Sequence, residues 1–126
     1  MIHKVLTLCF LLSQVSFVMG SENYGIAVHG GAGVMKNLSE NQKQKIEEQI
    51  TKTLTEAFKI IEQGGTSMDA VEFAVSEFED SPLFNAGRGS VYNSEEVQEM
   101  DASIMSGQNR SAGAVASVRT IKNPIK

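Results

Sequence analysis

The run Pro82-Leu83-Phe84-Asn85-Ala86-Gly87-Arg88-Gly89-Ser90-Val91-Tyr92-Asn93 separates two helical patterns from two strand-like patterns. Pro82 ends the preceding helical pattern, and Gly87 and Gly89 allow backbone angles that residues with a Cβ resist. Phe84, Val91 and Tyr92 are apolar enough to anchor the run against a core. An anchored loop that contains glycines holds its carbonyls and amides in fixed directions, which suits a binding role. A plain helix-to-strand connection is the equal alternative.

Two amphipathic helices are predicted before this loop. Ser39 and Gln42 form a capping box at the start of the first, and Gly64-Gly65 ends it. Its apolar residues recur at spacings of three and four, at Ile46, Ile50, Leu54, Ala57, Phe58 and Ile61. Thr66 and Asp69 form a second capping box. The predicted buried face of the second helix consists of Val71, Ala74, Val75 and Phe78.

The second helix has an acidic C-terminal end. Glu77, Glu79 and Asp80 lie where the helix dipole disfavours negative charge. A nearby cation would compensate for this arrangement. An acidic end exposed to water is the simpler interpretation.

A glycine-rich segment follows the first strand-like pattern. Tyr24–His29 is predicted to be a short buried strand, and it leads directly into Gly30-Gly31-Ala32-Gly33. Such glycines let backbone N–H groups converge on an anion or a carbonyl, although a tight turn is the structural alternative. The spacing matches neither G-x-G-x-x-G nor a P-loop, so nucleotide binding is a weak hypothesis. A lipase-like oxyanion loop would require a G-x-S-x-G motif, which these 126 residues lack. His29 is interpreted as a hydrogen-bonded structural residue rather than a base.

Two further strands are predicted after the loop. Val97–Met105 alternates in polarity, with Met100, Ala102 and Ile104 on one face, and Asp101 is expected to be partly buried with a hydrogen-bond partner. Ser111–Ile121 suits a strand covered on both faces, and Gly107 lies in the turn that would join the two into a hairpin. The order of elements predicts an incomplete layered α/β (α+β) unit with helices on one face of a sheet.

Residues 1–20 are predicted to be a secretory signal peptide rather than part of the fold. Lys4 precedes an apolar run too short to span a membrane, and small residues lie before a cleavage point at Ser21. Residues 21–126 then form one domain's worth of chain. The sequons at Asn37 and Asn109 agree with the secretory pathway, with secretion or lysosomal delivery as destinations.

Composition excludes several kinds of site. The 126 residues carry a net charge of −4 with no basic cluster, so neither nucleic acid nor a membrane is an expected partner. The single cysteine, Cys9, lies in the predicted signal peptide. Disulfides and a zinc-thiolate site are therefore excluded from residues 21–126.

Six ordered segments resemble the N-terminal part of plant-type asparaginases and isoaspartyl peptidases, which are N-terminal-nucleophile (Ntn) hydrolases. The similar segments are Val28–Gly33, Gly64–Val71, Pro82–Ser90, Glu99–Met105, Ser111–Ala116 and Lys122–Pro124. The lysosomal glycosylasparaginases are a second, less similar subfamily. A secreted binding module without catalytic activity is a third interpretation.

This resemblance implies a four-layer αββα precursor that cuts itself into α and β subunits and forms a homo-oligomer when complete. A threonine freed at the new N-terminus would attack the side-chain carbonyl of L-asparagine or of a β-aspartyl dipeptide, with its own amino group as base. That threonine follows a glycine beyond Lys126, so these residues are expected to be an incomplete, inactive α-subunit portion that needs the β-subunit portion. The only Gly-Thr pair is Gly65-Thr66, where Thr66 is interpreted as a helix cap.

The resemblance assigns three supporting roles within these residues. Asn85 matches an asparagine that lies beside the nucleophile and helps to place it. His29, Gly30, Gly31 and Gly33 match a glycine-rich loop that changes shape during self-cleavage. A structural sodium ion would be held by main-chain carbonyls, those of Phe78, Glu79, Ser81, Phe84, Ala86 and Arg88. No cofactor is implied for the chemistry.

Overall fold

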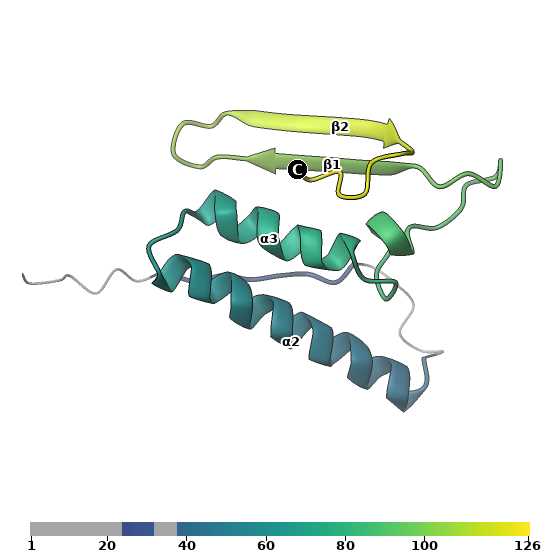
Figure 1. The fold of residues 1–126 in the computed structure, drawn as a ribbon, viewed down its shortest axis with the longest axis horizontal. Coiled ribbons are helices and arrows are strands. Elements are labelled where there is room, and N and C mark those ends of the chain that lie inside the picture. Colours follow the sequence, from purple (N-terminus) through teal and green to yellow (C-terminus); the bar gives the residue numbers. More distant parts are fainter. Residues whose placement is uncertain (1–23, 32–37) are drawn as a thin grey trace, which may run out of the picture.

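The computed structural model describes residues 24–31 and 38–126, in which two helices and a two-stranded antiparallel sheet form stacked layers (Figure 1). The elements are α2 (Glu40–Glu62), α3 (Ser67–Glu79), the 3-10 turn η2 (Gly87–Gly89), β1 (Met100–Met105) and β2 (Ala112–Val118). Helix α3 lies between the sheet and α2. This arrangement confirms a partial α/β unit with helices on one side of a sheet. The predicted signal peptide lies outside the described residues.

Both predicted capping boxes are formed. Ser39 is the N-cap of α2, and its hydroxyl and the Gln42 side chain each accept the other residue's backbone N–H. Thr66 and Asp69 make the equivalent pair at α3, with the Thr66 N–H donating to Asp69 Oδ2 at 2.8 Å. Gly64 follows α2 with φ +87°, the left-handed conformation that ends a helix and favours glycine. Local sequence therefore fixes where both helices begin.

We expect Thr66→Ala to lower the free energy of unfolding by about 1 kcal/mol, because the first turn of α3 loses its capping hydroxyl. Hydrogen bonds from the Thr66 hydroxyl and N–H also lower the pKa of Asp69. The contribution of Asp69 is therefore present above pH ~4 and is lost as the pH falls through its lowered pKa. Urea unfolding of the full-length protein at several pH values measures both effects. Thr51→Ala, on the exposed middle of α2, is the control and should cost almost nothing.

Small side chains bring the two helices together. Ala57 of α2 and Ala70 and Ala74 of α3 form the buried cluster, and the partly buried hydrophobic residues Ile26, Val28, Ile60, Ile61 and Phe73 pack around it. The predicted stripe of α2 faces this core. On α3, Ala74 and Phe78 are buried as predicted, but Val71 is 42% exposed and Ala70 is fully buried instead. The reason is that Val71 faces an open groove beside Met105 rather than α2.

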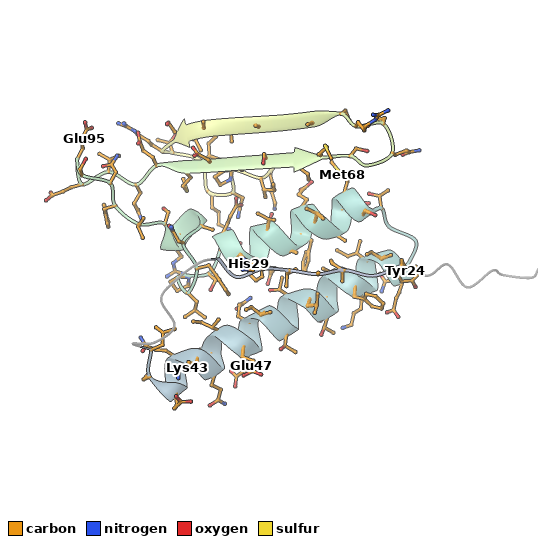
Figure 2. All side chains as sticks on the ribbon, turned by 180° about the vertical axis from the view of Figure 1, so that it is seen from behind. Tyr24, His29, Lys43, Glu47, Met68 and Glu95 are labelled. Atoms are coloured by element: carbon orange, nitrogen blue, oxygen red, sulfur yellow. The ribbon has the colours of Figure 1, made fainter. Side chains whose placement is uncertain are left out.

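The predicted strand at Tyr24–His29 is not a strand. This segment is extended and runs alongside the helices, with Tyr24 and His29 at its two ends (Figure 2). Ile26 and Val28 pack against the helix core, and Tyr24 packs against Phe58 with ring centroids 5.6 Å apart. The predicted burial holds only in part, since Ile26 and Val28 are partly buried and the other residues of the segment are exposed. The described residues supply no neighbouring strand to pair with this backbone.

The hairpin forms as predicted, with shorter strands. β1 pairs with β2 from Met105↔Ala112 to Met100↔Val118, and the turn at Gly107 closes with the Ser106 N–H donating to Ser111 O at 2.9 Å. Met100, Ala102 and Ile104 share the partly buried face. The prediction that Ser111–Ile121 is covered on both faces is wrong for the described residues. Six of the seven residues of β2 are exposed, because no described element packs against them.

Asp101 has its predicted hydrogen-bond partner but not its predicted burial. It is exposed, and its Oδ1 accepts the N–H of Ser117 at 2.8 Å. Ser117 has φ +54° and lies at a register shift opposite β1, so the Asp101 carboxylate replaces a ladder hydrogen bond that the bulge removes. Asp101 therefore fixes the register of the hairpin. Among residues 24–31 and 38–126, no helix has the length and apolarity needed to cross a membrane.

Candidate functional site

The loop that follows α3 is anchored by aromatic packing. We call residues 81–90 the asparagine loop, after Asn85; it contains η2 and lies at the end of the sheet opposite the hairpin turn (Figure 1). Phe84 is 5% exposed, and its ring packs against Phe78 of α3 with centroids 4.5 Å apart. The anchoring that the apolar side chains predicted is therefore present. Val91 and Tyr92, which follow the loop, are exposed instead.

The glycine-rich segment meets the asparagine loop. A Cβ added to Gly30 would lie 3.2 Å from both Ile50 Cδ1 and Phe84 Cε1, so a glycine at position 30 lets the backbone approach the loop's aromatic anchor. His29 accepts the N–H of Gly31 on its Nδ1 at 3.1 Å, which is the structural role predicted for it. Two segments more than fifty residues apart in sequence are thus neighbours. Gly33, the last member of the predicted glycine-rich set, lies outside the described residues.

The side-chain amide of Asn85 has a fixed orientation. Its Oδ1 accepts the backbone N–H of Val91 at 2.9 Å, across the width of the loop. The side chain is exposed, and within the described chain its Nδ2 makes no hydrogen bond. Because the oxygen is already occupied, Asn85 presents its NH₂ group as a donor. Such a donor is suited to hold an oxygen of a substrate or of a nucleophile.

Several carbonyls of the predicted cation site converge near the glycines of η2. A Cβ on Gly89 would collide with the Phe84 carbonyl oxygen and lie 3.0 Å from the Ser81 carbonyl oxygen. A Cβ on Gly87 would collide with the carbonyl oxygen of Glu79. These three oxygens accept no hydrogen bond from another described residue. Neutral carbonyl oxygens thus lie beside both glycines of η2, in what we call the carbonyl cradle, and a side chain at position 87 or 89 would occupy the space next to them.

Two other carbonyl oxygens of the predicted cation site already accept a hydrogen bond. Phe78 O accepts the N–H of Ser81 at 3.2 Å, and Ala86 O accepts the N–H of Gly89 at 2.9 Å. Each oxygen retains a second lone pair, and neutral carbonyls suit a hard monovalent cation. The described residues contain no group of three histidine, cysteine, aspartate or glutamate side chains placed to hold a metal. Of the six predicted carbonyls, those of Glu79, Ser81 and Phe84 lie beside the glycines of η2 and are of the type that suits sodium. Arg88 was predicted to contribute its carbonyl alone, and its side chain is exposed.

Glu79 contradicts the prediction of a water-exposed acidic helix end. Its residue exposure is 3%, its Oε1 accepts the N–H of Ile125 at 3.2 Å, and no described group bonds its Oε2. Burial raises the pKa of this carboxyl above the usual glutamate value. Ile125 is 46 residues away in sequence, so helical periodicity near Glu79 carried no signal for this contact.

The other two acidic residues of this helix end are paired with lysines. Lys122 Nζ lies 2.9 Å from Asp80 Oδ1, and Asn123 Nδ2 also donates to that oxygen at 3.0 Å. These hydrogen bonds lower the pKa of Asp80. Glu77 lies 3.7 Å from Lys52 of α2. The cations that compensate for the acidic end of α3 are therefore lysine side chains.

The segment from Lys122 to Lys126 was not expected to contact the loop region. Pro124 and Ile125 are buried at the end of α3, and Asn123 Nδ2 also lies 3.4 Å from Ser76 O. We call residues 122–126 the C-terminal segment. Local spacing in this segment predicts none of these contacts, and the resemblance of Lys122–Pro124 to a family is the one signal that marks the segment.

The predicted glycosylation residues are separate from this region. Asn109 lies in the exposed hairpin turn, where its Oδ1 accepts the N–H and hydroxyl of Ser111 at 3.0 and 2.7 Å. Asn37 lies outside the described residues.

At the opposite end of the hairpin, Arg119 pairs with Glu99 and lowers the pKa of that carboxyl. This pair closes the open end of the strands.

Comparison with known proteins places most of the chain in one family model. Residues 22–126 match the model described as asparaginase. The matched region contains the asparagine loop, both helices, the hairpin and the C-terminal segment.

Curated relatives give the same result across distant organisms. The chain is 50% identical over 101 residues to an isoaspartyl peptidase/L-asparaginase from Bos taurus, an alignment covering 80% of this chain and 32% of that one. It is 46% identical over 101 residues to the Homo sapiens protein of the same name, with the same coverage. A probable isoaspartyl peptidase/L-asparaginase 2 from Arabidopsis thaliana is 40% identical over 102 residues, covering 81% and 31%. The chain spans about a third of the length of these relatives.

Proposed function

This chain belongs to the asparaginase family of Ntn hydrolases, and we propose that it is the N-terminal portion of an enzyme that hydrolyses L-asparagine or β-aspartyl dipeptides. The observation that carries the proposal is the fixed amide of Asn85, whose Oδ1 is held by Val91 while its NH₂ group is exposed. In the proposed enzyme this donor helps to place the nucleophile and the scissile bond. Hydrolysis of L-asparagine compared with that of a β-aspartyl dipeptide distinguishes the two substrates.

The nucleophile of the proposed reaction is a threonine outside the described residues. Thr66, the one threonine that follows a glycine, is the N-cap of α3 and is bonded to Asp69. The threonines at 51, 53 and 55 lie within α2, where none could become a chain N-terminus without cutting the helix. The remaining described threonine, Thr120, follows Arg119 rather than a glycine. We therefore propose that residues 21–126 belong to an α subunit, inactive alone, and that the β-subunit portion supplies a threonine freed by self-cleavage. The exposed β2 strand supports this proposal, since it offers a surface for the missing layers.

Substrate hydrolysis by the purified full-length protein tests this function. We expect ammonia release from L-asparagine or leucine release from β-Asp-Leu, and no release from α-Asp-Leu, which differs only in the carbonyl that carries the peptide bond. A self-cleaved protein that hydrolyses neither L-asparagine nor β-Asp-Leu would contradict the proposed substrate class. The same preparation separates the proposed homo-oligomer from a monomer by sedimentation.

We further propose that the carbonyl cradle holds a structural sodium ion in this protein. The fit rests on the converging oxygens beside Gly87 and Gly89 and on their lack of hydrogen-bond donors among the described residues. When bound, the ion would fix the loop's main chain and would take no part in the chemistry. The residues proposed to hold it by their carbonyls are Phe78, Glu79, Ser81, Phe84, Ala86 and Arg88.

The sodium site predicts a specific salt effect on stability. Replacing choline chloride by NaCl at equal ionic strength should raise the Tm of the full-length protein. At a sodium concentration ten times Kd, the bound ion should add about 1.4 kcal/mol to the free energy of unfolding. Gly89→Ala should remove this increase, because its Cβ would occupy the space beside Phe84 O and Ser81 O. Gly107→Ala, whose Cβ would meet nothing within 4 Å, should retain it. Equal melting in the two salts would contradict the site.

We also propose that the protein enters the secretory pathway through the signal peptide at residues 1–20. Asn109 lies in an exposed turn, which suits a glycan acceptor. Expression in a secreting eukaryotic cell should give a product whose mass falls on treatment with peptide N-glycosidase. Asn109→Gln should remove one glycan, whereas Ser111→Thr should preserve it. An unglycosylated product that stays inside the cell would contradict this compartment.

A further inference from the structure

We propose that Glu79 is a positioning residue for the hydrolase, because its carboxyl holds the C-terminal segment while its Cβ and carbonyl lie against the turn at Gly87 in the loop that carries Asn85. This inference rests on the proposed function. The predicted cation site uses only the main-chain carbonyl of Glu79, and neither that site nor the loop motif gives its side chain a role. The carboxyl group of Glu79 contacts neither a substrate nor a nucleophile in this proposal. It acts through Asn85.

On the loop side, Glu79 supports the turn at Gly87. A Cβ on Gly87 would lie 2.6 Å from Glu79 Cβ, so the two backbones are in direct contact. The carbonyl of Gly87 accepts the N–H of Ser90 at 3.1 Å. The next N–H along the chain, that of Val91, is the donor that orients Asn85. A short series of contacts therefore connects Glu79 to the Asn85 amide.

On the other side, Glu79 holds the C-terminal segment. Its Oε1 accepts the N–H of Ile125 at 3.2 Å, and Ile125 is itself 9% exposed. The neighbouring Asp80 binds Lys122 and Asn123 of the same segment. Because a buried N–H that loses its acceptor is destabilising, removal of the carboxyl should release the segment at Ile125.

The burial of Glu79 supports a specific role between the asparagine loop and the C-terminal segment. At 3% exposure, Glu79 is among the most buried polar residues described, and Oε2 makes no hydrogen bond to another described group. A buried polar side chain retained at such a cost is expected to have a specific role. The geometry assigns that role to Oε1, which a glutamine can reproduce through its carbonyl oxygen. Alanine cannot reproduce it, and aspartate is one methylene too short.

The test compares variants of the full-length protein, with activity normalised to the self-cleaved fraction so that maturation and turnover are separated. We expect Glu79→Ala and Glu79→Asp to lower kcat about 10-fold or more with KM changed less than about 3-fold, since misplacement of a catalytic group affects the transition state. Glu79→Gln should stay within about 3-fold of the wild type. Glu77→Ala, on the same helix with a part-exposed side chain, is the matched control and should leave kcat unchanged.

A double-mutant cycle shows whether Glu79 acts through Asn85. If it does, Glu79→Ala should have no further effect on kcat in an Asn85→Ala background. Additive effects, a wild-type kcat in Glu79→Ala, or a loss in Glu79→Gln equal to that in Glu79→Ala would each overturn the proposal. If Glu79→Ala does not fold, Glu79→Asp carries the same comparison. An inactive wild type would instead refute the proposed function, so the two failures are distinguishable.

Discussion

Replacing Asn85 by aspartate in the full-length protein is expected to lower kcat about 100-fold while leaving the free energy of unfolding almost unchanged. Aspartate keeps an oxygen that accepts the Val91 N–H, so the loop retains its cross-link. It loses the NH₂ donors that Asn85 presents outside the loop. The expected loss is that of a donor placed beside the reacting groups, for which factors of about 10²–10³ are typical.

Asn85→Ala separates the two functions of this side chain. It removes both the acceptor for Val91 and the exposed donors, so both kcat and stability should fall. Asn109→Asp is the matched control, because Asn109 also accepts a backbone N–H through Oδ1 but lies at the far end of the hairpin. Steady-state kinetics and urea unfolding of the three variants test the assignment. Wild-type turnover in Asn85→Asp would show that the NH₂ group has no role.

Replacing Gly87 by alanine is expected to cost about 2–5 kcal/mol of stability. Gly87 has φ +50°, a conformation that costs a residue with a Cβ about 1–2 kcal/mol. The new methyl group would also collide with the Glu79 carbonyl oxygen and lie 2.6 Å from Glu79 Cβ. Both contacts are to the end of α3, which cannot move without disturbing the helix, and crowding of this kind costs about 1–3 kcal/mol.

Urea unfolding of the full-length protein measures this effect, and activity should fall with it because the loop carries Asn85. Gly107→Ala provides the comparison, since position 107 is open and has no positive φ. We expect that variant to change stability by less than about 1 kcal/mol. Equal stabilities for the two alanine variants would mean that the loop does not depend on the close approach of Gly87 to Glu79.

Short-range patterns predicted the elements of this fold well. The capping boxes at Ser39 and Thr66, the apolar stripe of α2 and the hairpin turn at Gly107 each depend on residues within a few positions of one another. Local sequence determines such features directly. The anchoring of the loop was predicted in part, because Phe84 is buried whereas Val91 and Tyr92 are exposed.

Features that depend on distant partners were not predictable in the same way. Tyr24–His29 has the alternation of a strand, yet a strand exists only where a second strand bonds its backbone. Burial of Ala70 rather than Val71 follows from the direction in which α3 faces α2. The environment of Glu79 depends on Ile125, which periodicity near position 79 does not reveal. The strand at Ser111–Ile121 has the composition of a covered strand, although the described residues leave it exposed.

The family resemblance marked two segments whose contacts local patterns do not reveal. Nothing in the spacing of Lys122-Asn123-Pro124 suggests that this segment packs against the end of α3. Likewise, no local rule relates Gly30 to Phe84, which lie in contact. The residues around Asn85 therefore gain their functional meaning from tertiary contacts and from family membership together.

N-terminal sequencing of the chains that form when the purified full-length protein is incubated tests the central claim most directly. The claim is that residues 21–126 support a nucleophile supplied by a later part of the same protein. We expect self-cleavage into two chains, with the second chain beginning at a threonine preceded by glycine in the precursor and located after Lys126. A full-length protein that remains a single chain, or one cleaved at a residue other than threonine, would contradict it.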